Sequence, residues 1–265
     1  MSKTTELMSA IRPKISVVIP AFNEEASIGL LVADIPRNIV DEVIVVDNGS
    51  TDKTAAIAKS KGATVVREER RGYGRACATG VEKVSQDCDI VVFMDGDYAD
   101  HPEEMPNLIN PISRGDYDLV IGSRIRGNRE NGSMTSTQVF GSWLSSFLIN
   151  LAYGYKYTDL GPFRAIRYQS LQSLGMSEMT YGWSIEMQVK AIQRGLRVLE
   201  VPVNYRCRIG QSKVSGTIQG SIRAGFRILW TIARLVLKSS HSSNSSPEST
   251  TQSSPQGQQI KQPSD

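Results

Sequence analysis

The sequence predicts a single α/β domain built on a mostly parallel sheet with helices on both faces. Short runs of apolar, β-branched residues alternate with segments of helical periodicity, an order typical of parallel sheets. Because the runs are continuously apolar, they indicate strands that are buried on both faces. Three polar loops (AFNEE, DNGSTD and DGDYAD) each follow one of these runs. Ligands of such sheets bind beyond the carboxyl ends of the strands, so we expect the three loops to form one site.

The elements follow in order along the chain. The predicted strands are residues 15–20 (ISVVIP), 42–46 (EVIVV), 63–66, 90–94 (IVVFM), 117–121 (YDLVI) and 198–205. Each is a short apolar run, and the first two are closed by a proline and by a loop of turn-forming residues. The predicted helices are residues 24–32, 51–61, 74–84 and 136–154, followed by a last one that carries Arg223 and Lys238. Their apolar residues recur at helical spacing.

Length and composition bound the domain organisation. The chain has 265 residues, of which 40% are hydrophobic, enough for one sizeable domain. We assign residues 1–14 to an N-terminal extension, 15–238 to the domain, and 239–265, rich in Ser, Gln and Pro, to a disordered tail. The formal net charge of +3 argues against a nucleic-acid-binding protein, which usually carries a strong basic excess.

The sequence also favours a cytoplasmic protein. Its three cysteines lack metal-ligand spacing and form no disulfide framework. The first 14 residues are polar and contain no secretory signal. No stretch approaches the roughly 20 apolar residues of a membrane span. Any membrane contact is therefore expected to be peripheral.

The sequence Asp95-Gly96-Asp97 follows an apolar strand directly. Two carboxylates separated by a glycine can reach one hard cation, and the glycine lets the backbone approach a diphosphate closely. The alternative is an ordinary acidic turn. Two further polar loops at neighbouring strand ends favour the metal site. A glycine-rich segment that contains Gly74 is expected to lie beside the nucleotide.

Taken in order, these motifs resemble family 2 glycosyltransferases of the GT-A fold. PAFNEE, VVDNGSTDKT and FMDGD carry the resemblance, and it continues through GSR at 122–124, DLGPFR at 159–164, GWSIE at 182–186 and RIGQSK at 208–213. It covers roughly residues 15–237. The sequence looks especially similar to the branch of dolichyl-phosphate mannosyltransferase and bacterial polyprenyl-phosphate glycosyltransferases.

The resemblance implies a role for each matching residue. Asp95 and Asp97 would hold Mg²⁺ or Mn²⁺, and Gly96 would lie against the nucleotide sugar. Nucleotide binding would fall to Pro20, Ala21, Asn23, Glu24 and Asp47. The sugar diphosphate or an acceptor phosphate would be held by Arg124, Arg164, Arg206 and Lys213, since arginine binds phosphate with two hydrogen bonds. Each of these cations has a structural ion pair as its alternative, and Asp47 could instead cap the helix that follows. Similar enzymes often have a further polar metal contact where this chain has Ala99, so Asp100 or water would complete the shell.

The acceptor decides whether a base is needed. A hydroxyl acceptor would require a general base, for which Asp159 and Glu186 are candidates, whereas a phosphate acceptor is already an anion. Asp159 could instead cap a turn or orient Arg164, and Glu186 could pair with Lys190 one helical turn later.

Two segments suggest contact with a membrane. Four basic residues of the last helix fall on one stripe beside a broad apolar surface: Arg223, Arg227, Arg234 and Lys238. Large apolar side chains share one face of the helix at 136–154, and serines share the other. Ordinary amphipathic packing is the alternative for both.

We therefore expect an inverting, metal-dependent hexosyltransferase that uses a UDP- or GDP-linked sugar and a polyprenyl phosphate acceptor. Two alternatives remain open: a saccharide or small-molecule hydroxyl acceptor, and a non-catalytic nucleotide-sugar-binding protein.

Overall fold

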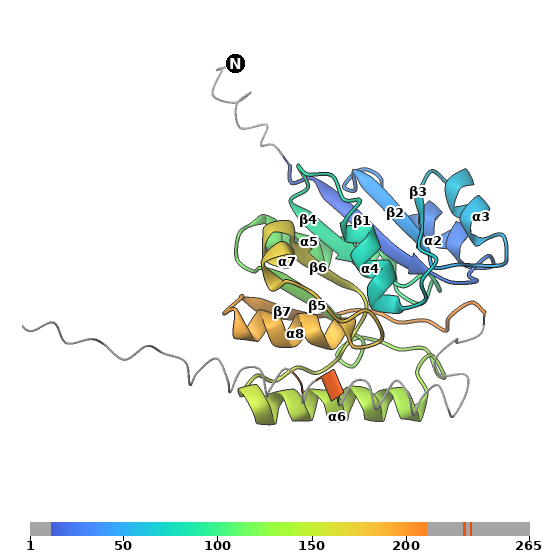
Figure 1. The fold of residues 1–265 in the computed structure, drawn as a ribbon. Coiled ribbons are helices and arrows are strands. Elements are labelled where there is room, and N and C mark those ends of the chain that lie inside the picture. Colours follow the sequence, from blue (N-terminus) through green and yellow to red (C-terminus); the bar gives the residue numbers. More distant parts are fainter. Residues whose placement is uncertain (1–11, 211–229, 232–233, 235–265) are drawn as a thin grey trace, which may run out of the picture.

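The computed structural model describes residues 12–210, 230–231 and 234. Its centre is a seven-stranded sheet of order β3-β2-β1-β4-β6-β5-β7 (Figure 1). The strands are β1 (Ile15–Ala21), β2 (Glu42–Asp47), β3 (Thr64–Arg67), β4 (Ile90–Phe93), β5 (Leu119–Ser123), β6 (Arg164–Arg167) and β7 (Val198–Pro202). All neighbours are parallel except β6, which runs antiparallel to both β4 and β5. The predicted, mostly parallel α/β sheet is confirmed.

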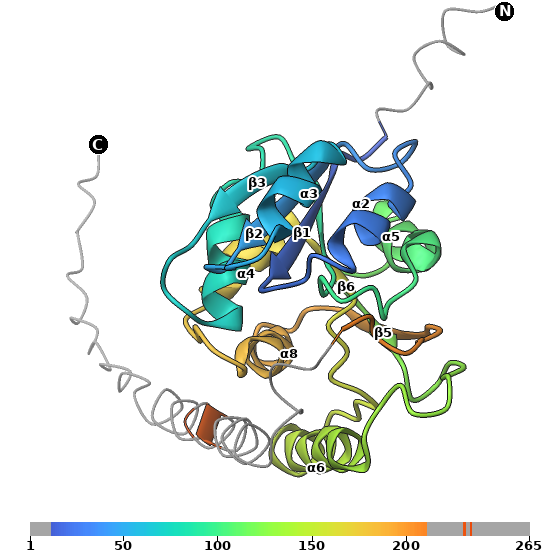
Figure 2. The same cartoon turned by 90° about the vertical axis from the view of Figure 1, so that its right-hand side faces the viewer.

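Helices cover both faces of the sheet (Figures 1 and 2). They are α2 (Ile28–Asp34), α3 (Thr54–Ser60), α4 (Tyr73–Val81), α5 (Met105–Ser113), α7 (Tyr168–Leu174) and α8 (Trp183–Gln193), with a short 3₁₀ turn at Pro102–Glu104. Helix α6 (Ser136–Tyr153) lies farther from the sheet, on the side of α8 (Figures 1 and 2). Buried side chains of α2, α3 and α5 form one hydrophobic core with the sheet. Those of α4, α7 and α8 form a second core on the opposite face. The inner strands β1, β2, β4 and β5 are buried on both sides because each core takes alternate side chains.

Helix α6 differs from the other helices in which face it buries. Thr135 begins it with a capping box to Gln138, and Gly154 ends it in the left-handed conformation. Its serines point inward: Ser142, Ser145 and Ser146 are buried. Its largest apolar side chains point outward, with exposed fractions of 58% for Phe140, 58% for Trp143, 50% for Phe147 and 73% for Leu151. The two predicted faces of this helix are therefore present, and the polar one packs on the protein.

The described part of the chain contains no helix with the length and apolar content that crossing a bilayer requires.

Candidate functional site

The candidate site is a pocket of about 380 Å³ at the carboxyl ends of β1, β2 and β4. The first, second and third predicted polar loops all contribute to it. Its lining residues are Pro20, Ala21, Phe22, Glu24, Asn48, Arg71, Gly72, Tyr73, Ala76, Asp95, Gly96, Asp97, Tyr181 and Arg208. Six predicted site residues are thus brought together: Pro20, Ala21, Glu24, Asp95, Gly96 and Asp97. The position of this pocket is the one that parallel sheets offer to ligands.

Asp95 and Asp97 form an acidic centre at the base of the pocket. One oxygen of Asp95, Oδ1, is buried and has no hydrogen-bond partner among the described residues. Burial, together with repulsion from Asp97, raises the pKa of Asp95 to about 7. Asp97 accepts a hydrogen bond from the Ala99 amide at 3.1 Å. An unfilled buried acceptor beside a second carboxylate fits a cation, which would satisfy the oxygen and offset the repulsion.

The protein supplies few further metal ligands. Among the residues that the structure places, no three His, Cys, Asp or Glu side chains are grouped to hold a metal ion. Magnesium commonly binds through one or two carboxylates, with substrate phosphates and water completing its shell. The residues present therefore fit a divalent ion that is shared with a diphosphate.

Gly96 brings the first loop close to this centre. A Cβ atom built on Gly96 would lie 3.3 Å from the carbonyl oxygen of Pro20 and 3.4 Å from the Cβ atom of Ala21. A larger residue would push the two loops apart. The absence of a side chain therefore matters for packing the acidic loop against β1.

Arg208 is a pocket residue whose role the sequence did not reveal. Its guanidinium lies 3.0 Å from Glu24 Oε1 and 3.3 Å from Asp97 Oδ2. The backbone holds it there, since the Ile209 amide donates to the Asp97 carbonyl at 3.1 Å. A guanidinium beside the acidic centre can bind the oxygens of a diphosphate. The motif RIGQSK contained this arginine, and its position at the start of that run was the available signal.

The other side of the pocket is aromatic. The Arg71 guanidinium lies 3.6 Å from the centroid of the Phe22 ring, and Tyr73 and Tyr181 line the same cavity. Asn48 shapes this wall by donating to the carbonyls of residues 68 and 70 and accepting from the Gly72 amide. Flat apolar rings beside a cation suit a nucleobase and its ribose.

Three predicted nucleotide-binding residues lie next to the pocket and contact its lining segments without lining the cavity themselves. Asn23 accepts a hydrogen bond from the Thr51 amide at 2.8 Å, and Asp47 accepts one from the Ser50 amide at 2.8 Å. Asp47 thus forms a turn at the end of β2, close to its alternative role as a cap. Gly74 packs against a neighbouring loop, because a Cβ atom there would lie 2.2 Å from the Glu178 carbonyl oxygen.

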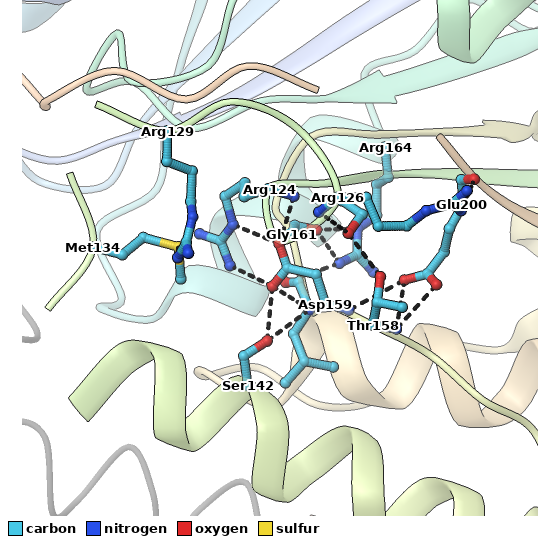
Figure 3. A network of polar contacts seen from close by, with 12 residues as sticks. Arg124, Arg126, Arg129, Met134, Ser142, Thr158, Asp159, Gly161, Arg164 and Glu200 are labelled. Atoms are coloured by element: carbon cyan, nitrogen blue, oxygen red, sulfur yellow. Dashed lines mark hydrogen bonds and ion pairs between the residues drawn. The ribbon is translucent and has the colours of Figure 1, made fainter. Parts of the chain in front are cut away.

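Asp159 and Arg124 form a buried ion pair (Figure 3). Arg124 donates Nε to Oδ2 at 2.8 Å and Nη2 to Oδ1 at 2.9 Å. Asp159 also accepts from the Ser142 hydroxyl at 2.7 Å and the Leu160 amide at 2.7 Å. Burial alone would raise the pKa of Asp159, but the charge and hydrogen bonds of Arg124 lower it to about 2. A carboxylate so fully occupied orients Arg124, rather than Arg164 as the sequence had suggested.

Arg164 lies beside this pair and its guanidinium faces backbone oxygens (Figure 3). Only 1% of it is exposed. It donates to the carbonyls of Gly161, Leu160 and Ser184. Burial lowers its pKa below the usual value of arginine. These contacts join the loop before β6 to the start of α8.

Glu186 pairs with Lys190 at 2.9 Å, as its alternative interpretation predicted. It is fully buried and also accepts from the Ser177 hydroxyl at 2.6 Å and the Glu178 amide at 2.6 Å. Burial opposes its ionisation, yet these hydrogen bonds leave its pKa lowered. Like Asp159, it therefore has its oxygens engaged.

The remaining predicted cations do not line the pocket. The Arg206 guanidinium stacks 3.6 Å from the centroid of the Tyr98 ring and donates to the Tyr98 carbonyl at 2.7 Å. Lys213 lies outside the described residues, as do Arg223, Arg227 and Lys238 of the predicted basic stripe. Arg234 faces the protein, 3.7 Å from Glu178.

Asp100 is buried close to the acidic centre without lining the pocket. Neither of its carboxylate oxygens has a partner among the described residues. Burial, with Asp95 and Asp97 nearby, raises its pKa well above the usual range.

Comparison with known proteins places this architecture among sugar-transferring enzymes. A profile described as "Glycosyl transferase family 2" matches residues 16–175. The chain is 35% identical over 205 residues to a dolichyl-phosphate hexose transferase of Haloferax volcanii, covering 76% of this chain and 86% of that one. It is 31% identical over 222 residues to an undecaprenyl-phosphate mannosyltransferase of Micrococcus luteus, covering 78% and 90%.

A solved structure shares the fold. Glucosyl-3-phosphoglycerate synthase of Mycobacterium tuberculosis, in complex with Mn²⁺, UDP-glucose and phosphoglyceric acid, superposes with a TM-score of 0.68 and 28% sequence identity. The match covers 84% of this chain and 80% of that one. The predicted GT-A fold is confirmed, and the predicted Mg²⁺ or Mn²⁺ agrees with the ion in that complex.

Proposed function

Because the chain belongs to glycosyltransferase family 2, we propose that it transfers a hexose from a nucleotide diphosphate sugar to a polyprenyl phosphate. The outward apolar face of α6 is the observation that carries this proposal. A sugar acceptor with a long apolar tail explains why a protein would expose Phe140, Trp143 and Phe147 together, which are between 50% and 58% exposed.

The donor would occupy the pocket at the strand ends. Asp95 and Asp97 would hold Mg²⁺ or Mn²⁺, which would neutralise the diphosphate leaving group. Arg208 would bind the same diphosphate, and the aromatic wall with Arg71 would take the base. Arg71 and Phe22 stack on each other, at 3.6 Å, and so give this wall a flat surface for a base.

The acceptor would approach from the side of α6. A second, shallower pocket of about 850 Å³ lies between the loop at 127–134 and the first half of α6. Val139, Phe140 and Trp143 give it an apolar wall, and Arg129 gives it a cation. The Arg129 guanidinium contacts the Met134 sulfur at 3.6 Å, and Glu130 lines the same pocket. A cation beside an apolar wall suits a phosphate with a hydrocarbon tail.

A phosphate acceptor also agrees with the state of the candidate bases. It needs no deprotonation, and both Asp159 and Glu186 have their oxygens engaged in the protein. The names of the Haloferax and Micrococcus relatives point to the same acceptor class. Peripheral contact with a membrane would follow, with the aromatic face of α6 in the interface.

A second candidate is transfer to the hydroxyl group of a small phosphorylated acid. The specific observation in its favour is the structural similarity to glucosyl-3-phosphoglycerate synthase, solved with phosphoglyceric acid. This reaction would need a general base, for which Asp159 and Glu186 are the candidates from the sequence, and both would have to exchange their present hydrogen bonds for the acceptor hydroxyl.

One assay separates the two candidates. Purified protein with Mn²⁺ would be offered UDP-glucose or GDP-mannose, each with a short polyprenyl phosphate or with 3-phosphoglycerate. Labelled sugar in the organic phase that requires the polyprenyl phosphate supports the proposal. Label confined to a water-soluble product with 3-phosphoglycerate contradicts it and favours the second candidate.

Two variants make the assay specific. Asp97→Asn is expected to abolish transfer, because it removes a charge from the acidic centre. Asp116→Asn is the matched control, since the Asp116 side chain is 53% exposed and pairs only with surface Arg114 among the described residues. Transfer that survives Asp97→Asn unchanged would contradict the metal assignment.

A further inference from the structure

The loop between α7 and α8 (residues 175–182) packs behind one wall of the donor pocket, the segment Gly72–Arg75. Its backbone accepts hydrogen bonds from that wall: the Gly74 amide donates to the Thr180 carbonyl at 3.1 Å and the Arg75 amide to the Met179 carbonyl at 3.0 Å. Tyr181 of the same loop lines the pocket directly. The position of this loop therefore sets the position of the nucleotide wall.

The contact between loop and wall is too close for side chains. A Cβ atom on Gly72 would lie 2.3 Å from the Met179 carbonyl oxygen, and one on Gly74 would lie 2.2 Å from the Glu178 carbonyl oxygen. The two segments are therefore in close backbone contact, with no space between them. A shift of the loop must therefore displace the wall.

Two buried carboxylates hold the loop in its shape. Glu178, 1% exposed, accepts from the Thr180 amide at 3.0 Å and the Thr180 hydroxyl at 2.5 Å. Glu186, fully buried, accepts from the Ser177 amide at 2.9 Å and the Glu178 amide at 2.6 Å. Buried charges of this kind need cations close by, or they destabilise the segment that carries them.

Lys190 pairs with Glu186 at 2.9 Å, and a cation that lies near both carboxylates comes from the C-terminal part of the chain. The Arg234 guanidinium lies 3.7 Å from Glu178 and 3.9 Å from Glu186. The buried Thr231 hydroxyl lies 3.4 Å from Glu178 Oε2. Thr231 also packs directly against the end of the loop, since a Cβ atom on Gly182 would lie 2.6 Å from this hydroxyl.

We propose that Arg234, with Thr231, is a positioning residue of the nucleotide site. It neutralises Glu178 of the loop and Glu186 of α8, which together hold the loop at 175–182. The loop fixes the wall at Gly72–Arg75, and the wall sets nucleotide affinity. The inference rests on the proposed function only in that the pocket takes a nucleotide. It assigns to the C-terminal part of the chain a contribution to donor binding that is separate from any contact with lipid.

The test compares Arg234→Gln with Arg234→Lys in the full-length chain. Affinity for UDP and GDP in the presence of Mn²⁺ would be measured by calorimetry. Arg234→Gln is expected to weaken nucleotide binding about tenfold, and Arg234→Lys to stay within about threefold of wild type, a range typical of indirect coupling between sites. Arg114→Gln, which removes an exposed guanidinium paired with Asp116, is the matched control and should change nothing.

Hydrogen exchange supplies a second readout that needs no nucleotide. The Gly74 and Arg75 amides cross the contact between wall and loop, so they are expected to exchange faster in Arg234→Gln. Unchanged affinity together with unchanged exchange at these two amides would overturn the proposal, even if the melting temperature fell. If the wild type bound neither nucleotide, the proposed function would fail, while the exchange data would still decide whether Arg234 positions the wall.

A milder variant covers the case in which Arg234→Gln does not fold. Thr231→Val keeps the shape of the side chain and removes the hydroxyl beside Glu178. Faster exchange at Gly74 and Arg75 in this variant supports the proposal, and wild-type exchange contradicts it.

Discussion

The ionised form of the buried Asp95 side chain destabilises the metal-free protein. Burial and the neighbouring Asp97 raise its pKa to about 7, and one oxygen lacks a partner among the described residues. In the unfolded chain the same carboxyl ionises near pH 4. Between these values the unfolded state releases a proton that the folded state retains, so ionisation of Asp95 costs stability as the pH rises.

We expect Asp95→Asn to stabilise the metal-free protein while abolishing transfer. The gain should be absent near pH 4, grow up to about pH 7 and then level off, with a rise in Tm of roughly 10 °C at pH 8. Thermal unfolding in the presence of a chelator measures it. A lower Tm for the variant at pH 8 would show that the buried charge is compensated within the protein.

Asp159 presents the opposite case. Burial opposes its ionisation, but Arg124 lowers its pKa to about 2, so the pair contributes stability above about pH 4 that is lost as the pH falls toward 2. Asp159→Ala would leave the Arg124 guanidinium, 11% exposed, without its partner. The free energy of unfolding should fall by about 3–5 kcal/mol at pH 7.

Urea unfolding checks this value against Asp116→Ala. The latter breaks an exposed pair with Arg114 and should cost less than about 1 kcal/mol. Equal losses for the two variants would contradict the structural role of the Asp159–Arg124 pair.

Site residues could be predicted from the sequence where they directly follow a recognisable strand. Asp95, Asp97 and Glu24 follow strand ends, and parallel strands place their ends at one edge of the sheet. Arg208 and Tyr181 line the same pocket, but they come from segments that reach it through contacts distant in sequence. No periodicity or spacing encodes such an approach. Roles for Asn23, Asp47 and Gly74 in contact with the nucleotide remain predictions, since these residues support the pocket from behind.

At the scale of elements, the sequence was informative where an apolar pattern repeats. The strands at 15–20 and 42–46 and the helix at 136–154 differ from the observed bounds by one residue at most. Strand β6 has the sequence RAIR, and its buried Arg164 hides the apolar pattern of a strand. Helix α5 contains Pro106 near its start and Pro111 inside, which local rules assign to breaks. Tertiary contacts stabilise both elements.

Helix α6 should bind membranes through its exposed side chains. Replacing Phe140, Trp143 and Phe147 together with Gln removes the outward apolar surface. Binding to anionic lipid vesicles is expected to fall at least about tenfold, with Tm changed by less than about 2 °C because these side chains are exposed. Co-sedimentation with vesicles measures the binding.

Leu30→Gln serves as the control for this helix. Leu30 is 48% exposed and lies on α2, so its replacement should leave vesicle binding unchanged. Equal binding by the triple variant and the wild type would remove α6 from the membrane contact.

Helix α4 lies so close to the sheet that one methyl group should disturb it. A Cβ atom on Gly80 would lie 2.4 Å from Val18 Cγ1 and 3.1 Å from Val46 Cγ2. Gly80→Ala is therefore expected to cost about 1–3 kcal/mol in denaturant unfolding. Gly141→Ala in α6 is the matched control, since nothing lies within 4 Å of its added carbon. There the better helix propensity of alanine should stabilise by up to about 1 kcal/mol, and a loss as large as that of Gly80→Ala would contradict the steric argument.

For the whole molecule, the alternation of strands and helices predicted one mostly parallel sheet, and the seven strands form one sheet. Residues 239–265 lie outside the described part, and their disorder stays a prediction. A chain that ends at residue 238 is expected to keep its Tm within about 1 °C, because segments low in apolar residues bury too little surface to add stability. Nucleotide affinity should also be unchanged. Loss of either property on removing the tail would show that it packs on the domain.

The order of the strands in the sheet implies an order in which parts of the chain can fold during synthesis. The four strands β3, β2, β1 and β4 are neighbours in the sheet, and residues 15–93 supply all of them. They can pair while the ribosome is still making the rest. Strand β6 pairs with both β4 and β5, and Tyr181 and Arg208 follow it. The nascent chain therefore gains its acidic centre early but completes the donor pocket only after about four-fifths of the chain (residue 208 of 265) has been synthesised.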